Sequence, residues 1–148
     1  MAKRKKNILV SVWLASTSGR RILTQILNMV NSNLPWRIRL ITEPDLLTQD
    51  EIKRAIDQKF DGFIGFVNDS AAAAALAHSF LPAVIMNYAP PVLQTRTNKI
   101  VTISDNDEEI GKTAASHYLS LGKFASYAFV PDAESHGWSR LRERGFRR

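Results

Sequence analysis

Short apolar runs alternate with amphipathic stretches along the chain. The apolar runs are rich in β-branched residues and predict strands over residues 7–13, 36–42, 62–67, 83–86, 99–103 and 125–130. Amphipathic or alanine-rich stretches predict helices over residues 19–31, 48–58, 70–79 and 105–121, and a further helix that begins near Trp138. Strands that alternate with helices are typical of a parallel sheet covered on both faces, so we expect an α/β fold with a parallel sheet flanked by helices.

Local patterns agree with this fold. Residues 7–13 are almost continuously apolar, which is typical of a strand buried on both faces. Residues 36–42 alternate apolar side chains with arginine, which is typical of a strand near a sheet edge. Thr48 and Glu51 have the order of a capping box, in which each side chain bonds the other's backbone N–H. The alanine run 71–75 favours a helix that packs close to a sheet.

The formal net charge of +6 comes from the two ends of the chain. Residues 3–6 and 140–148 hold nine of the 20 basic side chains, and the rest holds 11 basic against 13 acidic ones. The body is therefore slightly acidic, which argues against a nucleic-acid-binding surface on the folded part. The chain has no cysteine, which excludes disulfides, thiolate metal sites and a cysteine nucleophile. No run approaches the roughly 18 apolar residues of a membrane span.

The N-terminus has two interpretations. Residues 3–6 are basic and residues 8–15 are mostly apolar, which is the order of a secretory signal. However, the apolar run is short, rich in β-branched residues and followed at once by Gly19, Arg20 and Arg21, which open an amphipathic helix. We therefore favour a solubilising tail before a first buried strand, and export remains the alternative.

Ligands of open parallel α/β sheets sit at the carboxyl ends of the strands, so the residues that follow each predicted strand are the candidates for a site. Hydroxyl, amide, carboxylate and guanidinium groups gather there beside aromatic rings, which is the mixture that a sugar needs. The predicted ligand-binding residues are Trp13, Ser16, Arg20, Asn68, Asp69, Asn87, Asp105, Trp138 and Arg142.

Four of these residues also have a structural interpretation. Asp69 and Asp105 stand where helix N-caps belong, Trp13 could be core, and Arg142 could be a solvated surface charge. The three histidines lie far apart without carboxylates at ligand spacing, so no metal site is expected. No catalytic or nucleotide-binding motif occurs, so neither an enzyme nor a cofactor is expected. Residues 16–19 could hold a phosphate at a helix start, as in a small phosphate-binding α/β module.

Several segments resemble known regulators. Residues 19–26 resemble the first helix, and residues 61–64 the third-strand entry, of the xylose-operon-regulator type of AraC-family transcription factors. Residues 104–106 with Gly111, followed by residues 117–122, are similar to the second-lobe entry shared by LacI-type regulators and periplasmic sugar-binding proteins.

The Arg142-x-x-Gly145-Phe146 pattern matches the same families. The resemblance implies the first lobe of a type I periplasmic-binding-protein-like sensor over residues 1–103 and the incomplete start of a second lobe over residues 104–148. It also implies that Asp105 lies near the hinge and that Arg142 points into the cleft between the lobes.

The resemblance further implies a cytoplasmic sensor that closes on a small sugar, a pentose such as xylose. The full-length parent would be a homodimer and would reach DNA through a C-terminal helix-turn-helix domain that this chain lacks. Gln25 and Asn28 stand where that group's first helix has glycine and tyrosine.

A second lobe that stops early would leave apolar side chains uncovered. The residues concerned are Tyr127, Phe129, Leu141 and Phe146. We therefore expect aggregation, oligomerisation or poor order after about residue 104.

Overall fold

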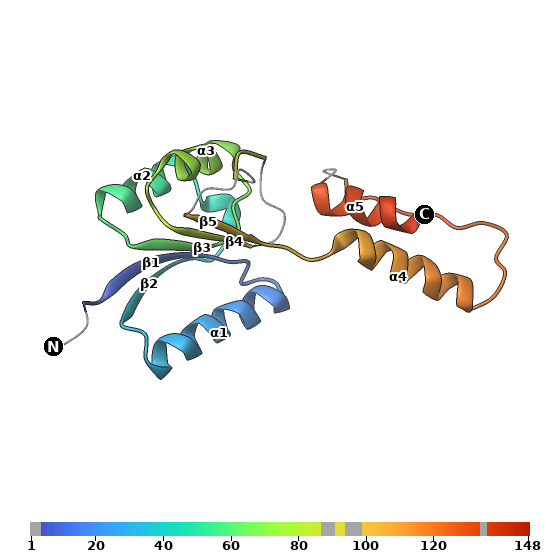
Figure 1. Ribbon diagram of the computed structural model, residues 1–148, viewed down its shortest axis with the longest axis horizontal. Coiled ribbons are helices and arrows are strands. Elements are labelled where there is room, and N and C mark those ends of the chain that lie inside the picture. Colours follow the sequence, from blue (N-terminus) through green and yellow to red (C-terminus); the bar gives the residue numbers. More distant parts are fainter. Residues whose placement is uncertain (1–3, 87–90, 94–98, 134–135) are drawn as a thin grey trace. The chain divides into compact units, whose positions relative to one another are not determined.

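The computed structural model describes residues 4–86, 91–93, 99–133 and 136–148. The chain forms two compact units, Met1–Ile103 and Ser104–Arg148, which are described separately below (Figure 1). No helix among the described residues is long and apolar enough to cross a membrane.

The first unit contains a five-stranded sheet in the order β2-β1-β3-β4-β5, in which all neighbouring strands are parallel. Its strands are β1 (Lys6–Ser11), β2 (Trp36–Ile41), β3 (Gly62–Gly65), β4 (Ala83–Met86) and β5 (Ile100–Ile103). The first five predicted strands are confirmed, and β2 is an edge strand as its alternation predicted. β1 and β3 end earlier than predicted, at Ser11 and at Gly65, and Gly65 adopts a φ of 146°.

Helices cover both faces of this sheet, with α1 (Thr17–Ser32) on one face and α2 (Gln49–Asp57) and α3 (Ser70–His78) on the other (Figure 1). Two single-turn 3₁₀ helices, Pro44–Leu46 and Pro91–Leu93, also occur. Alternate residues of a strand point to opposite faces, so β1 contributes to both cores.

One core lies under α1 and the other under α2 and α3. Ile8 and Val10 of β1 pack with Ile26 of α1, whereas Leu9 packs with the group that contains Leu76 of α3. The prediction that β1 is buried on both faces is confirmed. Leu27 of α1 nevertheless remains 42% exposed.

Side-chain caps mark the starts of α2 and α3. The Thr48 hydroxyl accepts from the Glu51 N–H at 3.4 Å, and Asp69 caps α3 by accepting from the Ala72 N–H at 2.6 Å. The reciprocal half of the predicted capping box is wrong. The Thr48 N–H donates to the Leu46 carbonyl, and the Glu51 carboxylate instead forms ion pairs with two arginines, Arg39 and Arg54.

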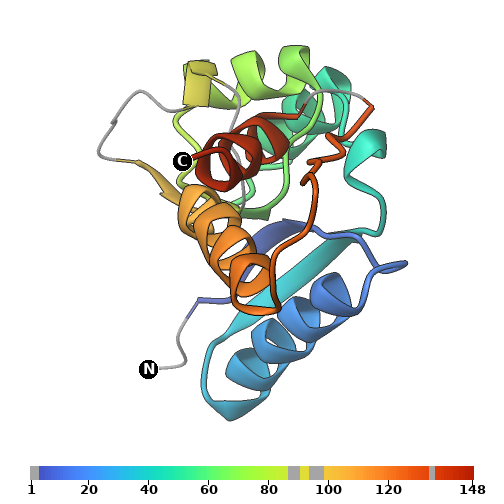
Figure 2. The same cartoon turned by 90° about the vertical axis from the view of Figure 1, so that its right-hand side faces the viewer.

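The second unit is a pair of crossing helices, α4 (Asp107–Ser120) and α5 (Gly137–Phe146) (Figure 2). Two glycines let the helix backbones approach each other. A Cβ added at Gly111 of α4 would lie 2.0 Å from the Arg142 carbonyl oxygen, and one added at Gly145 of α5 would lie 1.9 Å from the Glu108 carbonyl oxygen. Any larger residue at either position would force the helices apart.

The predicted strand over residues 125–130 is wrong, because these residues form no strand. A strand needs a hydrogen-bonded neighbour, and the described part of the second unit contributes no other strand. The apolar faces are exposed in part as predicted. Tyr127 is 41% exposed, but Phe129 and Tyr118 both pack their rings against Phe146.

Candidate ligand-binding site

The first unit has a candidate site at the carboxyl end of its sheet. The chain leaves β1 for β2 on one side and returns to β3 on the other, so the loops after β1 and β3 diverge at this edge. Open α/β sheets bind ligands at such a switch point. Trp13 and Ser16 lie in the first of these loops, and Asn68 and Asp69 lie in the second.

Ser16 and Arg20 hold the loop after β1 together. The Ser16 hydroxyl donates to the Trp13 carbonyl at 3.0 Å and accepts from the Gly19 N–H at 3.0 Å. Arg20 donates from Nη1 to the carbonyls of Leu14 and Ala15 at 2.8 and 2.9 Å. The polar groups of both side chains are therefore used to fix the loop.

The loop after β3 is organised in a similar way. The exposed Asn68 donates from its amide nitrogen to the Asp45 carboxylate at 2.8 Å, and Asp69 is the N-cap of α3. Trp13 is half-buried. Asn87, also a predicted ligand-binding residue, lies outside the described residues.

The second unit brings a buried carboxylate and an arginine together. Arg142 of α5 donates from Nε to Oδ1 of Asp107, the first residue of α4, at 2.9 Å. The Asp107 side chain is 3% exposed, whereas that of Arg142 is 35% exposed. A carboxylate so deeply buried needs a charged partner, and the N-terminus of α4 adds favourable partial charge. Arg142 is thus neither free nor simply a solvated surface charge.

Aromatic side chains extend this pair into a cluster. The guanidinium carbon of Arg142 lies 4.8 Å from the centre of the Trp138 ring, in a cation–π contact. The His136 ring stacks on Trp138 at 6.2 Å with an interplanar angle of 13°, and its Nδ1 lies 2.6 Å from Oδ2 of Asp132. We call Asp107, Trp138 and Arg142 the Arg142 cluster.

The sequence predicted Asp105 as the acidic ligand-binding residue at the start of the helix, whereas in the structure Asp107 begins α4 and pairs with Arg142. Asn106, not Asp105, caps α4, since its side-chain oxygen accepts from the Glu109 N–H at 3.3 Å. Asp105 precedes the cap and is exposed. The N-cap interpretation of Asp105 is therefore wrong. The available signal was the acidic triplet Asp107, Glu108 and Glu109, which is typical of a first helical turn.

Away from these sites, one carboxyl group has a perturbed pKa. The backbone N–H of Asn7 donates to Asp61 at 2.8 Å and, together with the Arg4 and Lys6 charges, lowers the pKa of Asp61 from its ordinary value against a smaller opposing effect of burial. Asp61 lies just before β3, at the opposite end of the sheet from the candidate loops. It fastens the start of β1 to the sheet.

No protein-family model and no curated protein sequence matches the chain. Solved structures do. A putative ribose operon repressor from Burkholderia thailandensis has a TM-score of 0.66 and 17% identity over 97% of this chain and 54% of its own. A LacI transcriptional regulator from Lactobacillus brevis has a TM-score of 0.66 and 15% identity, covering 96% of this chain and 53% of its own.

A further match is to full-length LpoA from Haemophilus influenzae, with a TM-score of 0.56 and 14% identity over 97% of this chain and 27% of its own. The chain thus spans about half the length of the two regulators. At such low identities the likeness establishes architecture and no activity. The chain has the parallel α/β fold of a type I periplasmic-binding-protein-like lobe, and shares it with LacI-type transcription regulators.

Proposed function

We propose that this chain is the ligand-sensing region of a bacterial transcription regulator and that it binds a sugar at the Arg142 cluster. The observation that carries the proposal is the pairing of Arg142 with the buried Asp107, beside the Trp138 ring. The shared fold with a ribose operon repressor supports a sugar as the ligand.

The hydrogen bonding of Arg142 favours a neutral ligand. Its Nε–H is used by Asp107, which leaves the N–H groups on the two terminal nitrogens to donate to ligand oxygens. Because Asp107 compensates the arginine charge, an anion gains less here than it would at an unpaired arginine. A polyol accepts these hydrogen bonds without bringing a charge, and its C–H surface suits the face of Trp138.

The residues of the first unit have a supporting role in this proposal. Ser16, Arg20 and Asp69 fix the two loops at the carboxyl edge of the sheet, and Trp13 and Asn68 provide surface for a ligand. For Asp105, which belongs to the second unit, the resemblance to sugar regulators supports a role near a hinge.

The finer features follow from the resemblance to sugar regulators. The ligand is a pentose such as xylose, and the full-length protein is a cytoplasmic homodimer that reaches DNA through another domain of LacI or AraC type. The sugar binds the closed arrangement of the lobes better than the open one and so shifts the population that reaches DNA. The protein has no catalytic role.

The test of this proposal is sugar binding to the whole chain, measured by isothermal titration calorimetry with D-xylose and D-ribose. Arg142→Gln should weaken binding by roughly 10- to 100-fold, the value of hydrogen bonds from a charged donor. Arg144→Gln is the matched control, because Arg144 lies one half-turn away on α5, with its side chain 57% exposed. The proposal is refuted if neither sugar binds, or if the two variants weaken binding equally.

Export is a distinct alternative, in which a sugar-binding protein loses its N-terminal residues. Lys6–Ser11 forms β1, an interior strand between β2 and β3, so removal of residues up to about 17 would take away a strand with two partners. Mass spectrometry of the protein from its native cells decides the matter. An N-terminus near residue 17 would overturn the cytoplasmic regulator.

A further inference from the structure

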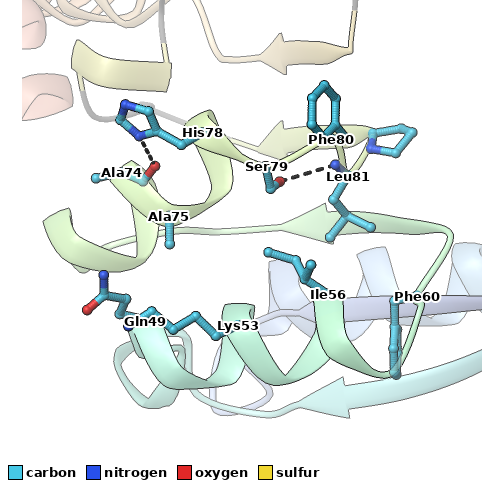
Figure 3. A pocket seen from close by; sticks show the side chains of 11 residues that line it. Gln49, Lys53, Ile56, Phe60, Ala74, Ala75, His78, Ser79, Phe80 and Leu81 are labelled. Atoms are coloured by element: carbon cyan, nitrogen blue, oxygen red, sulfur yellow. Dashed lines mark hydrogen bonds between the residues drawn. The ribbon is translucent and has the colours of Figure 1, made fainter.

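A hollow of about 640 Å³ lies between α2 and α3 (Figure 3). This volume falls in the range of small-molecule sites, roughly 300–1,000 Å³. Ile56 and Phe60 line it from the α2 side, and Ala75 and Leu81 line it from the α3 side. It is remote from the candidate loops, because Phe60 and Leu81 lie just before β3 and β4, at the amino ends of these strands.

The alanine run of α3 creates this space. Ala72 and Ala73 are fully buried against the core, whereas Ala74 and Ala75 are half-buried and face the hollow. A side chain of ordinary size at Ala75 would extend into the gap between the two helices. The run therefore does more than favour a helix, since it leaves an apolar cleft beside α2.

The polar side chains around the hollow are basic or neutral. None of its lining residues is acidic. Lys53 lies on its α2 side, where its ammonium group is 3.9 Å from the exposed Asp50 carboxylate. On the α3 side, His78 Nδ1 lies 2.7 Å from the Ala74 carbonyl and so carries a hydrogen, which leaves Nε2 for another partner.

A second cation lies at the α3 rim. Phe80 lines the hollow and is 84% exposed. The Lys99 ammonium group lies 4.4 Å from the centre of its ring, in a cation–π contact. An apolar floor between basic side chains complements a molecule with an apolar body and a negative head. We propose that this hollow binds a small amphipathic carboxylate, with its chain between α2 and α3 and its carboxylate at Lys53.

The test uses octanoate on the whole chain, with calorimetry for affinity and hydrogen–deuterium exchange to locate the bound molecule. Octanoate should protect amides in residues 49–60 and 74–82, and 1-octanol, which lacks the charge, should bind more weakly. Ala75→Phe should abolish binding by filling the hollow. Ala71→Phe, at an exposed position of the same helix, should leave binding unchanged.

A charge variant keeps the test decisive if Ala75→Phe fails to fold. Lys53→Gln should weaken octanoate binding about fivefold, as expected for an exposed ion pair. Lys112→Gln is the matched control, because Lys112 is also an exposed lysine with an acidic partner three residues earlier, Glu109 at 3.5 Å. Equal effects of the two lysine variants, or protection confined to residues outside 49–60 and 74–82, would overturn the proposal.

Discussion

The crossing of α4 and α5 predicts that Gly111→Ala destabilises the second unit. Alanine normally stabilises a helix interior relative to glycine by up to about 1 kcal/mol. Here, however, the new Cβ would lie 2.0 Å from the Arg142 carbonyl oxygen and 2.9 Å from the Phe146 nitrogen. Both are backbone atoms of α5, so no flexible side chain can move aside.

The cost of the new methyl group follows from that geometry. Restoring an ordinary contact of 3.4 Å requires the helices to separate by about 1.4 Å at this point. Overpacking of this kind costs about 1–3 kcal/mol. Separation also lengthens the 2.9 Å bond between Arg142 and Asp107, which leaves a buried carboxylate without its partner. After the gain in helix propensity, we expect a net loss of about 1–2 kcal/mol.

Hydrogen exchange of the α4 and α5 amides measures this loss directly, because it reports the opening of the second unit apart from the first. Thr113→Ala is the control: it introduces the same residue at an exposed position of α4, and should stabilise by up to about 0.7 kcal/mol. If Gly111→Ala slowed exchange as Thr113→Ala does, the two helices would not cross as closely as described.

Two further predictions concern buried polar groups and pH. The Ser11 hydroxyl is buried without a hydrogen-bond partner among the described residues, so Ser11→Ala should leave the free energy of unfolding unchanged or raise it in urea denaturation. Ser139→Ala should instead lower the free energy of unfolding by about 1–2 kcal/mol, because the Ser139 hydroxyl accepts from the Asp132 N–H at 2.9 Å. The hydrogen bond from Asn7 to Asp61 holds the Asp61 pKa below its unfolded value of about 3.9. The ionised Asp61 therefore stabilises the fold at pH values above its unfolded pKa, and this stabilisation is lost as the pH falls through its folded pKa. The Asp61→Asn variant, which does not titrate there, should lose less stability than the wild type when the pH is lowered from about 5 to about 3.

The first unit could be predicted from sequence because its signals are local. Burial of a strand requires a β-branched apolar run, and these runs predicted the five strands of the sheet in the right places. Burial of one helix face requires apolar residues at helical spacing, and this spacing predicted α1. Strand ends were less accurate. β3 stops at Gly65, which has a φ of 146° and approaches the Ser11 backbone, in a distant part of the chain, so closely that a Cβ would lie 2.0 Å from the Ser11 carbonyl oxygen. Such a contact leaves no periodic pattern.

The second unit was harder because its structure depends on what packs against each segment. Residues 125–130 have the composition of a strand, but no other strand of the second unit occurs among the residues that the structure describes. Several residues near the start of α4 could act as its N-cap, and the sequence alone does not choose between Asp105, Asn106 and Asp107. The structure resolves this choice through the cap at Asn106.

That choice links the stability of the second unit to the proposed site. Gly111 lies four residues after Asp107, so both occupy one face of α4. The Arg142 carbonyl lies against Gly111, and the Arg142 guanidinium group donates to Asp107. The close crossing that the glycine permits is therefore what brings the arginine to the buried carboxylate. It follows that Gly111→Ala should lower stability and sugar affinity together, whereas Arg144→Gln, which leaves the crossing intact, should lower neither by much. A Gly111→Ala variant with full sugar affinity would mean that Arg142 binds its ligand without the help of Asp107.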